Sequence, residues 1–145
     1  MSLSAVIVDT NVVVAGLLTS NADSPVARIL DGMLLAAFSF VVSNDLLAEY
    51  RTVLVRPALR KLHGLTVAEV EEVLTDLAQH AIVMTPVVAP PAPDPGDRLL
   101  WELLAARADL LLVTGDKLLL ADPGMRGRVL SPRDFMVLAG SARAL

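Results

Sequence analysis

The chain has 145 residues, the usual length of one domain, and 12 Lys and Arg against 16 Asp and Glu give it a net charge of -4. The lack of cysteine excludes disulfides, thiol catalysis and cysteine-ligated metals, and no apolar run reaches the roughly 20 residues of a membrane span. The acidic charge excludes nucleic-acid binding by counterion release alone, so a polyanionic substrate would require a divalent cation at its site.

The hydrophobic content is high, at 54%, while aromatic residues make up only 3%. A core of Leu, Val and Ala suits helices packed on a buried sheet. It also leaves apolar surface over, so we expect a homodimer or a higher homo-oligomer. No basic segment precedes the first apolar stretch, which argues against a signal peptide, and we therefore expect a cytoplasmic location and no membrane association.

Strand and helix patterns alternate along the first half of the chain. Short apolar runs predict strands, and Ser24, Ser43 or Asn44, and Thr66 are placed to cap the helices between them. The predicted elements are a strand over 5–8, a helix over 25–35, a strand over 38–42, a helix over 45–55, a helix from 66 to about 79 and a strand over 81–85.

A proline-rich segment, 86–95, separates this half from a second alternating series and predicts a stiff irregular connection. The elements predicted after it are a helix over 97–107, a strand over 110–113, a short helix over 117–120, a weak strand over 128–130 and a helix from 132 to about 139. We therefore expect one α/β domain over residues 1–145, with a parallel sheet of four to five strands covered on both faces.

Four carboxylates fall at strand–helix junctions. Asp9 follows the first predicted strand and Asp116 the fourth, while Glu49 and Asp97 lie at the start of the helices after the second and third. Sites in such sheets form at the carboxyl ends of the strands, so we expect all four at one edge. Clustered anions repel unless a cation binds, and oxygen-only ligands suit Mg²⁺ or Mn²⁺. One or two such ions would activate a water for phosphodiester hydrolysis.

Each acid also has a simpler interpretation. Asp9 would cap a turn. Glu49 would be an exposed helix residue that pairs with Arg51 or Arg56. Asp97, like Asp116, would serve as a cap or turn residue. The presence of all four acids at one edge favours the metal site over these separate roles.

Further polar residues lie at the same edge and are candidates for orienting a carboxylate or a water molecule. They are Thr10, Asn11, Ser43, Asp94 and Thr114. Capping is the alternative role for each of them. His63 and His80 are isolated, and we predict neither as a base or a ligand.

The four acids occur within segments 6–12 (VIVDTNV), 46–50 (LLAEY), 94–103 (beginning DPGD) and 112–119 (LVTGDKLL). In this order and spacing, the segments resemble the four acidic motifs of the PIN-domain nucleases. The resemblance covers nearly the whole chain. Relatives of this subgroup often have another Asp where this chain has Gly96, so the third motif carries one acid fewer.

The resemblance implies a three-layer α/β/α sandwich and Mg²⁺- or Mn²⁺-dependent endonucleolytic cleavage of RNA. It implies that Asp9, Glu49, Asp97 and Asp116 are the metal ligands and catalytic residues. Many bacterial members, similar to the VapC proteins, are toxins held inactive by a small antitoxin, and dimers are common. Other members serve in RNA processing, so the expected partners are RNA, a second copy of the chain and, for a toxin, an antitoxin.

Two other classes of protein compete with the nuclease. A non-catalytic PIN-like module would retain the fold and bind protein or RNA with a silent site. A phosphotransfer protein would use Asp9 as phosphoacceptor, but a haloacid-dehalogenase-type phosphatase needs a second Asp where this chain has Asn11. A receiver domain would place its phosphoacceptor after the third strand.

Overall fold

The computed structural model describes residues 4–125 and 127–144, with five short strands in this part of the chain. The strands are β1 (Val6–Val8), β2 (Val41–Val42), β3 (Ile82–Val83), β4 (Leu111–Val113) and β5 (Val129–Leu130). All the strand pairings among them are parallel: β4 lies between β1 and β5, and β2 pairs with β3. A parallel bridge between Val6 and Phe40 joins the two ladders, so the spatial order is β3–β2–β1–β4–β5.

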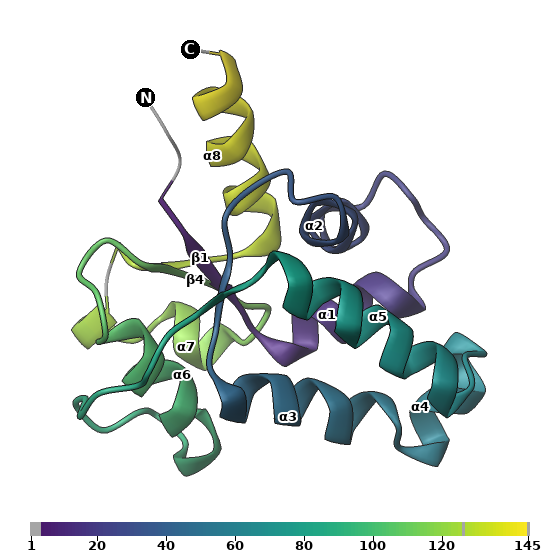
Figure 1. The fold of residues 1–145 in the computed structure, drawn as a ribbon. Helices are drawn as coiled ribbons and strands as arrows, with labels where there is room; N and C mark the ends of the chain where they lie inside the picture. The colour runs from purple at the N-terminus through teal and green to yellow at the C-terminus, as the bar shows by residue number, and fades with distance from the viewer. Residues whose placement is uncertain (1–3, 126, 145) are drawn as a thin grey trace.

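Helices cover both faces of these strands, which confirms the predicted α/β sandwich. Helices α1, α2, α5 and α8 lie on one side of β1 and β4, and α6 and α7 lie on the other (Figure 1). The helices are α1 (Thr10–Leu18), α2 (Pro25–Leu34), α3 (Asn44–Leu54), α4 (Pro57–His63), α5 (Val67–His80), α6 (Arg98–Leu104), α7 (Lys117–Leu120) and α8 (Pro132–Ala144), with short 3₁₀ turns at Pro95–Asp97 and Pro123–Met125. Nowhere in the described residues is there a helix of the length and apolarity that crossing a membrane requires.

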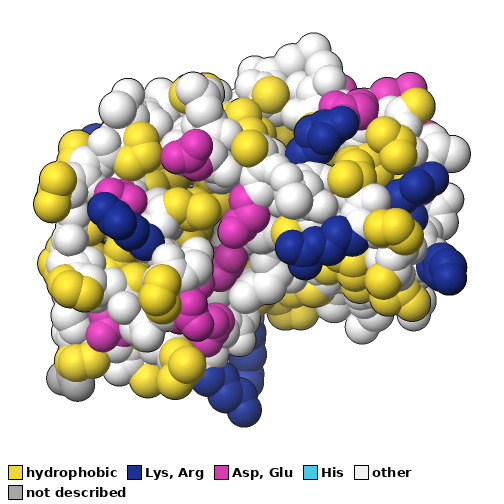
Figure 2. All heavy atoms as spheres, turned by 90° about the horizontal axis from the view of Figure 1, so that it is seen from below, with side chains coloured by type: hydrophobic (Ala, Val, Ile, Leu, Met, Phe, Trp, Pro, Cys, Tyr) yellow, Lys and Arg dark blue, Asp and Glu magenta, His cyan; other side chains and the backbone are white. Residues whose placement is uncertain are grey.

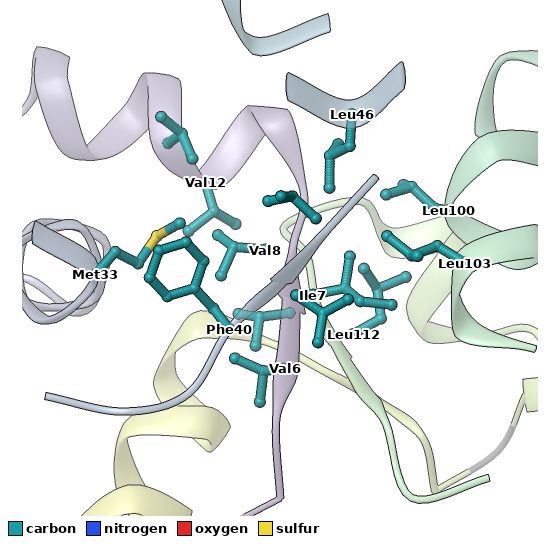
Figure 3. Packing of buried hydrophobic residues seen from close by; sticks show 14 of the residues in the cluster. Val6, Ile7, Val8, Val12, Met33, Phe40, Leu46, Leu100, Leu103 and Leu112 are labelled. Carbon is teal, nitrogen blue, oxygen red and sulfur yellow. The ribbon is translucent and has the colours of Figure 1, made fainter. Parts of the chain in front are cut away.

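The central strand β1 is buried on both faces, as expected for a strand between helical layers. Its side chains alternate: Ile7 lies toward Leu100 and Leu103 of α6, whereas Val6 and Val8 lie toward Phe40 and Met33 (Figure 3). This double burial fixes where the strand ends, and therefore where the polar residues after it emerge.

Helices α1 and α2 pack very closely at Gly16. A Cβ atom at this position would lie 2.8 Å from the Val26 carbonyl oxygen and 2.9 Å from the Leu30 Cβ atom. Glycine is therefore required by the close approach of the two helices. This contact holds α1 against α2, and the N-terminal end of α1 directly follows the carboxyl end of β1.

The sequence patterns missed α1 and α4. The α1 segment, TNVVVAGLL, is apolar on almost every side and β-branched at three consecutive positions, so it shows no helical stripe. Pro57 follows the helix predicted over 45–55 and is typical of a helix end, but it also occupies the first position of α4, where proline is favoured. The predicted strands are shorter in the structure, the helix predicted over 97–107 spans Arg98–Leu104, and the last helix extends beyond residue 139 to Ala144.

Candidate active site

The order of the strands changes side at the carboxyl ends of β1 and β4. After β1 the chain builds β2 and β3 on one side, and it then crosses to β4 on the other side of β1. The two strand ends stay paired, since the Asp9 amide donates to the Val113 carbonyl at 2.9 Å. In parallel sheets the crevice at such a reversal is the usual ligand site.

Asp9 is the most buried acid at this edge, with 8% of its surface exposed. It occupies the N-cap position of α1, but its side chain makes no capping hydrogen bond. Instead its Oδ2 atom accepts a hydrogen bond of 2.8 Å from the Thr114 hydroxyl and a longer one of 3.4 Å from the Asn11 amide. The Asp9 carboxylate is therefore held by side chains and aimed at the crevice edge.

Thr114 connects the ends of the two strands. Its side chain is fully buried, and its hydroxyl donates to Asp9 while accepting the Asp116 backbone N–H at 3.0 Å. The Asn11 side chain adds a second link, because its Oδ1 atom accepts the Gly115 N–H at 3.2 Å. These bonds set the position of the β4–α7 loop relative to α1.

Glu49 reaches the edge from the first half of α3, whose N-cap is Ser43. Its Oε2 atom accepts a hydrogen bond from the Thr10 hydroxyl at the start of α1. The next residue, Tyr50, is fully buried and donates its hydroxyl to the Val8 carbonyl at the end of β1. Two successive residues of α3 thus tie this helix to the β1–α1 junction, and the alternative in which Glu49 pairs with an arginine is wrong for this structure.

Asp97 and Asp116 approach from the other side of the crevice. Asp97 precedes α6, makes no capping hydrogen bond and is half-buried. Asp116 is the N-cap of α7, where its Oδ1 atom accepts the Leu118 N–H at 2.9 Å. Asp94 is exposed, and its carboxylate accepts the Gly96 N–H at 2.8 Å.

The acids share one electrostatic environment. Burial raises the pKa of Asp97 to about 6, with further contributions from the negative charges of Asp9, Asp116, Asp94 and Glu49. Burial also raises the pKa of Asp9, and the Thr114 hydroxyl partly opposes this rise. The face of the molecule seen from below in Figure 2 has a band of acidic side chains near its middle. The four predicted acids therefore lie within electrostatic range of Asp97, and the charge of Glu49 also acts on Asp9.

Comparison with known protein families decides what kind of domain carries this arrangement. The family model described as PIN domain matches residues 5–118, a span that contains all four acids. The chain belongs to the PIN-domain family. PIN domains have a nuclease-type fold and are generally metal-dependent nucleases. A comparison with curated proteins finds no match.

The donor set of this PIN domain fits a hard divalent cation. Every acidic group at the edge offers carboxylate oxygens, the ligands that Mg²⁺ and Mn²⁺ prefer, and soft cysteine donors are absent. Within the described ranges, no three acidic or histidine side chains stand close enough to hold an ion without movement. The assignment of the four acids as metal ligands stays a prediction.

Two of the predicted supporting residues are engaged elsewhere. The Ser43 hydroxyl is buried and accepts the Leu46 N–H at 3.1 Å, so it caps α3. The Asp94 carboxylate closes the turn before Asp97 and reaches the other acids only through its charge. For both residues the alternative capping role describes the observed hydrogen bonds.

Sequence reasoning missed Tyr50. A buried tyrosine needs a partner for its hydroxyl, and the chain's one tyrosine directly follows Glu49. That adjacency was the available signal. The partner itself, the Val8 carbonyl, lies 42 residues away in the chain and is revealed only by the fold.

Proposed function

We propose that this PIN domain is an endoribonuclease that hydrolyses RNA phosphodiester bonds with Mg²⁺ or Mn²⁺. The observation that carries the proposal is the convergence of Asp9, Glu49, Asp97 and Asp116 from four separate segments at the carboxyl ends of β1 and β4. Four carboxylates in a partly buried crevice are unfavourable without a cation and favourable with one.

Asp9, Glu49, Asp97 and Asp116 would hold the ion. When bound, it would supply an activated water and stabilise the charge that develops on the scissile phosphate. The protein's own contribution is to orient the ligands: Thr114 fixes one oxygen of Asp9, and the Thr10 hydroxyl fixes one oxygen of Glu49. Hydroxyl groups that hold carboxylates reduce the reorganisation needed when the cation binds.

The raised pKa of Asp97 adds a proton exchange to cation binding. A carboxyl with a pKa of about 6 carries a proton in part of the molecules near neutral pH. Cation binding would expel that proton, since a metal ligand must be ionised. We therefore expect the apparent metal affinity to fall as the pH decreases through about 6.

As a biological role we propose the toxin of a toxin–antitoxin pair, acting in the cytoplasm as a homodimer or a higher homo-oligomer and held inactive by a small antitoxin. RNA processing is the alternative role for the same chemistry. The two roles separate in one experiment, in which the protein is expressed in a bacterial host alone and together with the product of any short reading frame that adjoins its own. Growth arrest that this neighbour relieves supports the toxin role.

The direct test of activity is incubation with a pool of single-stranded and structured RNAs in Mn²⁺, in Mg²⁺ and in EDTA. The Asp9→Asn protein preserves the size of the side chain and the acceptor for Thr114, while the exposed Asp76→Asn on α5 is the matched control for loss of one acid. We expect cleavage by the wild type and by Asp76→Asn only with metal, and no cleavage by Asp9→Asn. Equal cleavage by all three proteins, or cleavage in EDTA, contradicts the proposal.

A further inference from the structure

An open groove of about 530 Å³ runs from the acidic edge along the contact between α1 and α3. It begins at Asp9 and Glu49 and ends at an arginine, and its walls between these ends are apolar. The residues that matter for its chemistry are Asp9, Glu49, Val14, Leu18, Val53 and Arg56. Its volume lies within the range of pockets that bind small molecules or single units of a polymer.

The groove follows from the helical period of its two walls. On α1, Val14 and Leu18 lie one and two turns beyond the acidic end. On α3, Glu49 and Val53 are four residues apart and share one face. Arg56 lies beyond the end of α3, as the N-cap of α4. The valine and leucine side chains are half-buried, so a ligand in the groove would contact them.

The cation at the far end of the groove has no acidic partner. Arg56 is exposed, and the described side chains include no carboxylate within ion-pair distance of it. The nearby Arg51 on α3 differs, because it pairs with Glu71 of α5. The charge of Arg56 is therefore available to an anionic ligand that lies in the groove.

The chain's aromatic residues offer no surface on which a nucleobase could stack beside this site. Tyr50 and Trp101 are buried in the core, and Phe38 packs edge-on against Phe40 and Phe135. Single-stranded RNA is usually held by base stacking on aromatic or arginine side chains together with phosphate contacts. The groove lining also includes Thr10 and Asn11, but both already hydrogen-bond within the protein, to Glu49 and to the Gly115 N–H. A base in the groove therefore meets mainly aliphatic side chains and arginine.

We propose that the α1–α3 groove binds the RNA nucleotide next to the scissile phosphodiester, a statement that rests on the proposed ribonuclease function. The base and ribose lie against Val14, Leu18 and Val53, and the following phosphate lies on the Arg56 guanidinium. Continuity selects this occupant, because the same groove opens onto the carboxylates where the phosphate to be cleaved must lie. Apolar walls do not read the hydrogen-bonding edges of a base, so this subsite tolerates all four bases.

Steady-state cleavage of a single-stranded RNA that the wild type cuts tests the assignment. Arg56→Gln should raise KM about ten-fold, leave kcat within about two-fold, and reduce the slope of log KM against log salt by about 0.7, the share of one phosphate contact. Arg56→Lys should restore most of the salt slope, since it returns the charge. Arg133→Gln on α8 removes an equally exposed arginine far from the groove in the fold and should change neither KM nor the slope.

A comparison of two substrates, an ordinary RNA and an abasic oligomer, tests the apolar walls. Leu18→Ala should raise KM about three- to ten-fold for ordinary RNA, yet have no effect on an abasic ribose-phosphate oligomer, which has no base to contact. Identical KM values and salt slopes for Arg56→Gln and Arg133→Gln overturn this inference alone and leave the groove to a protein ligand. A wild-type protein that cleaves no RNA under any metal condition overturns the proposed function, and the inference with it.

Discussion

Replacement of Asp97 by asparagine tests whether the ionised Asp97 carboxylate destabilises the folded protein in the absence of a cation. The pKa of this carboxyl is raised from 3.8 to about 6, first by burial and then by Asp9, Asp116, Asp94 and Glu49. A shift of about two units corresponds to about 3 kcal/mol at 1.36 kcal/mol per unit, and screening of this partly exposed group reduces the effect to about 1 kcal/mol. Because folding raises this pKa, protonation of Asp97 stabilises the folded state relative to the unfolded state. This contribution is complete below pH 3.8 and is lost as the pH rises through about 6.

Urea unfolding in EDTA at pH 4.0 and pH 7.5 measures this contribution. At pH 7.5, Asp97→Asn should raise the free energy of unfolding by about 1 kcal/mol over the wild type, and the difference should shrink toward zero at the lower pH. The control Asp76→Asn, on an exposed face of α5, should stay within about 0.5 kcal/mol at both values. With saturating Mg²⁺ the order reverses, because only the wild type gains the full binding energy. An Asp97→Asn protein that is equally or less stable than the wild type in EDTA at pH 7.5 refutes the reasoning.

Three further substitutions probe the supports of the site. Thr114→Val should weaken metal binding about 10- to 100-fold by calorimetry while Thr114→Ser keeps it, and equal affinities for the two variants would argue against the orienting hydroxyl. Tyr50→Phe leaves the buried Val8 carbonyl without its donor and should lower the free energy of unfolding by about 1–2 kcal/mol; an unchanged denaturation midpoint would contradict this. Gly16→Ala should destabilise the α1–α2 contact by about 1–3 kcal/mol, whereas Gly140→Ala, with open space around it, should not.

The location of the site was accessible from the sequence because it depends on local features. Asp9 directly follows a buried apolar run, and Asp116 follows another, so the carboxyl edge of a parallel sheet could be inferred for both. The polar residues at this edge were harder to separate. Ser43 and Thr114 are both hydroxyl residues just after a strand, yet one caps its own helix and the other reaches Asp9 across the sheet.

What the sequence did not reveal depends on contacts between distant segments. Helix α1 packs against α2, α3 and α4 and is apolar on nearly all sides, so it lacks the polar face that gives the periodic signal by which helices are recognised. The link from Tyr50 to Val8 and the groove that ends at Arg56 arise only when α3 packs beside α1. Single residue patterns therefore located the acids but not the surroundings that orient them.

The most direct test of the shared-cation account is a crystal structure of the protein grown with Mn²⁺, with the ion located by its anomalous scattering. The account predicts a peak at the carboxyl ends of β1 and β4, coordinated by Asp9 and by oxygens from among Glu49, Asp97 and Asp116 at about 2.0–2.3 Å. A structure at saturating Mn²⁺ in which this edge holds no ion, or in which Asp9 does not coordinate the ion, would contradict it.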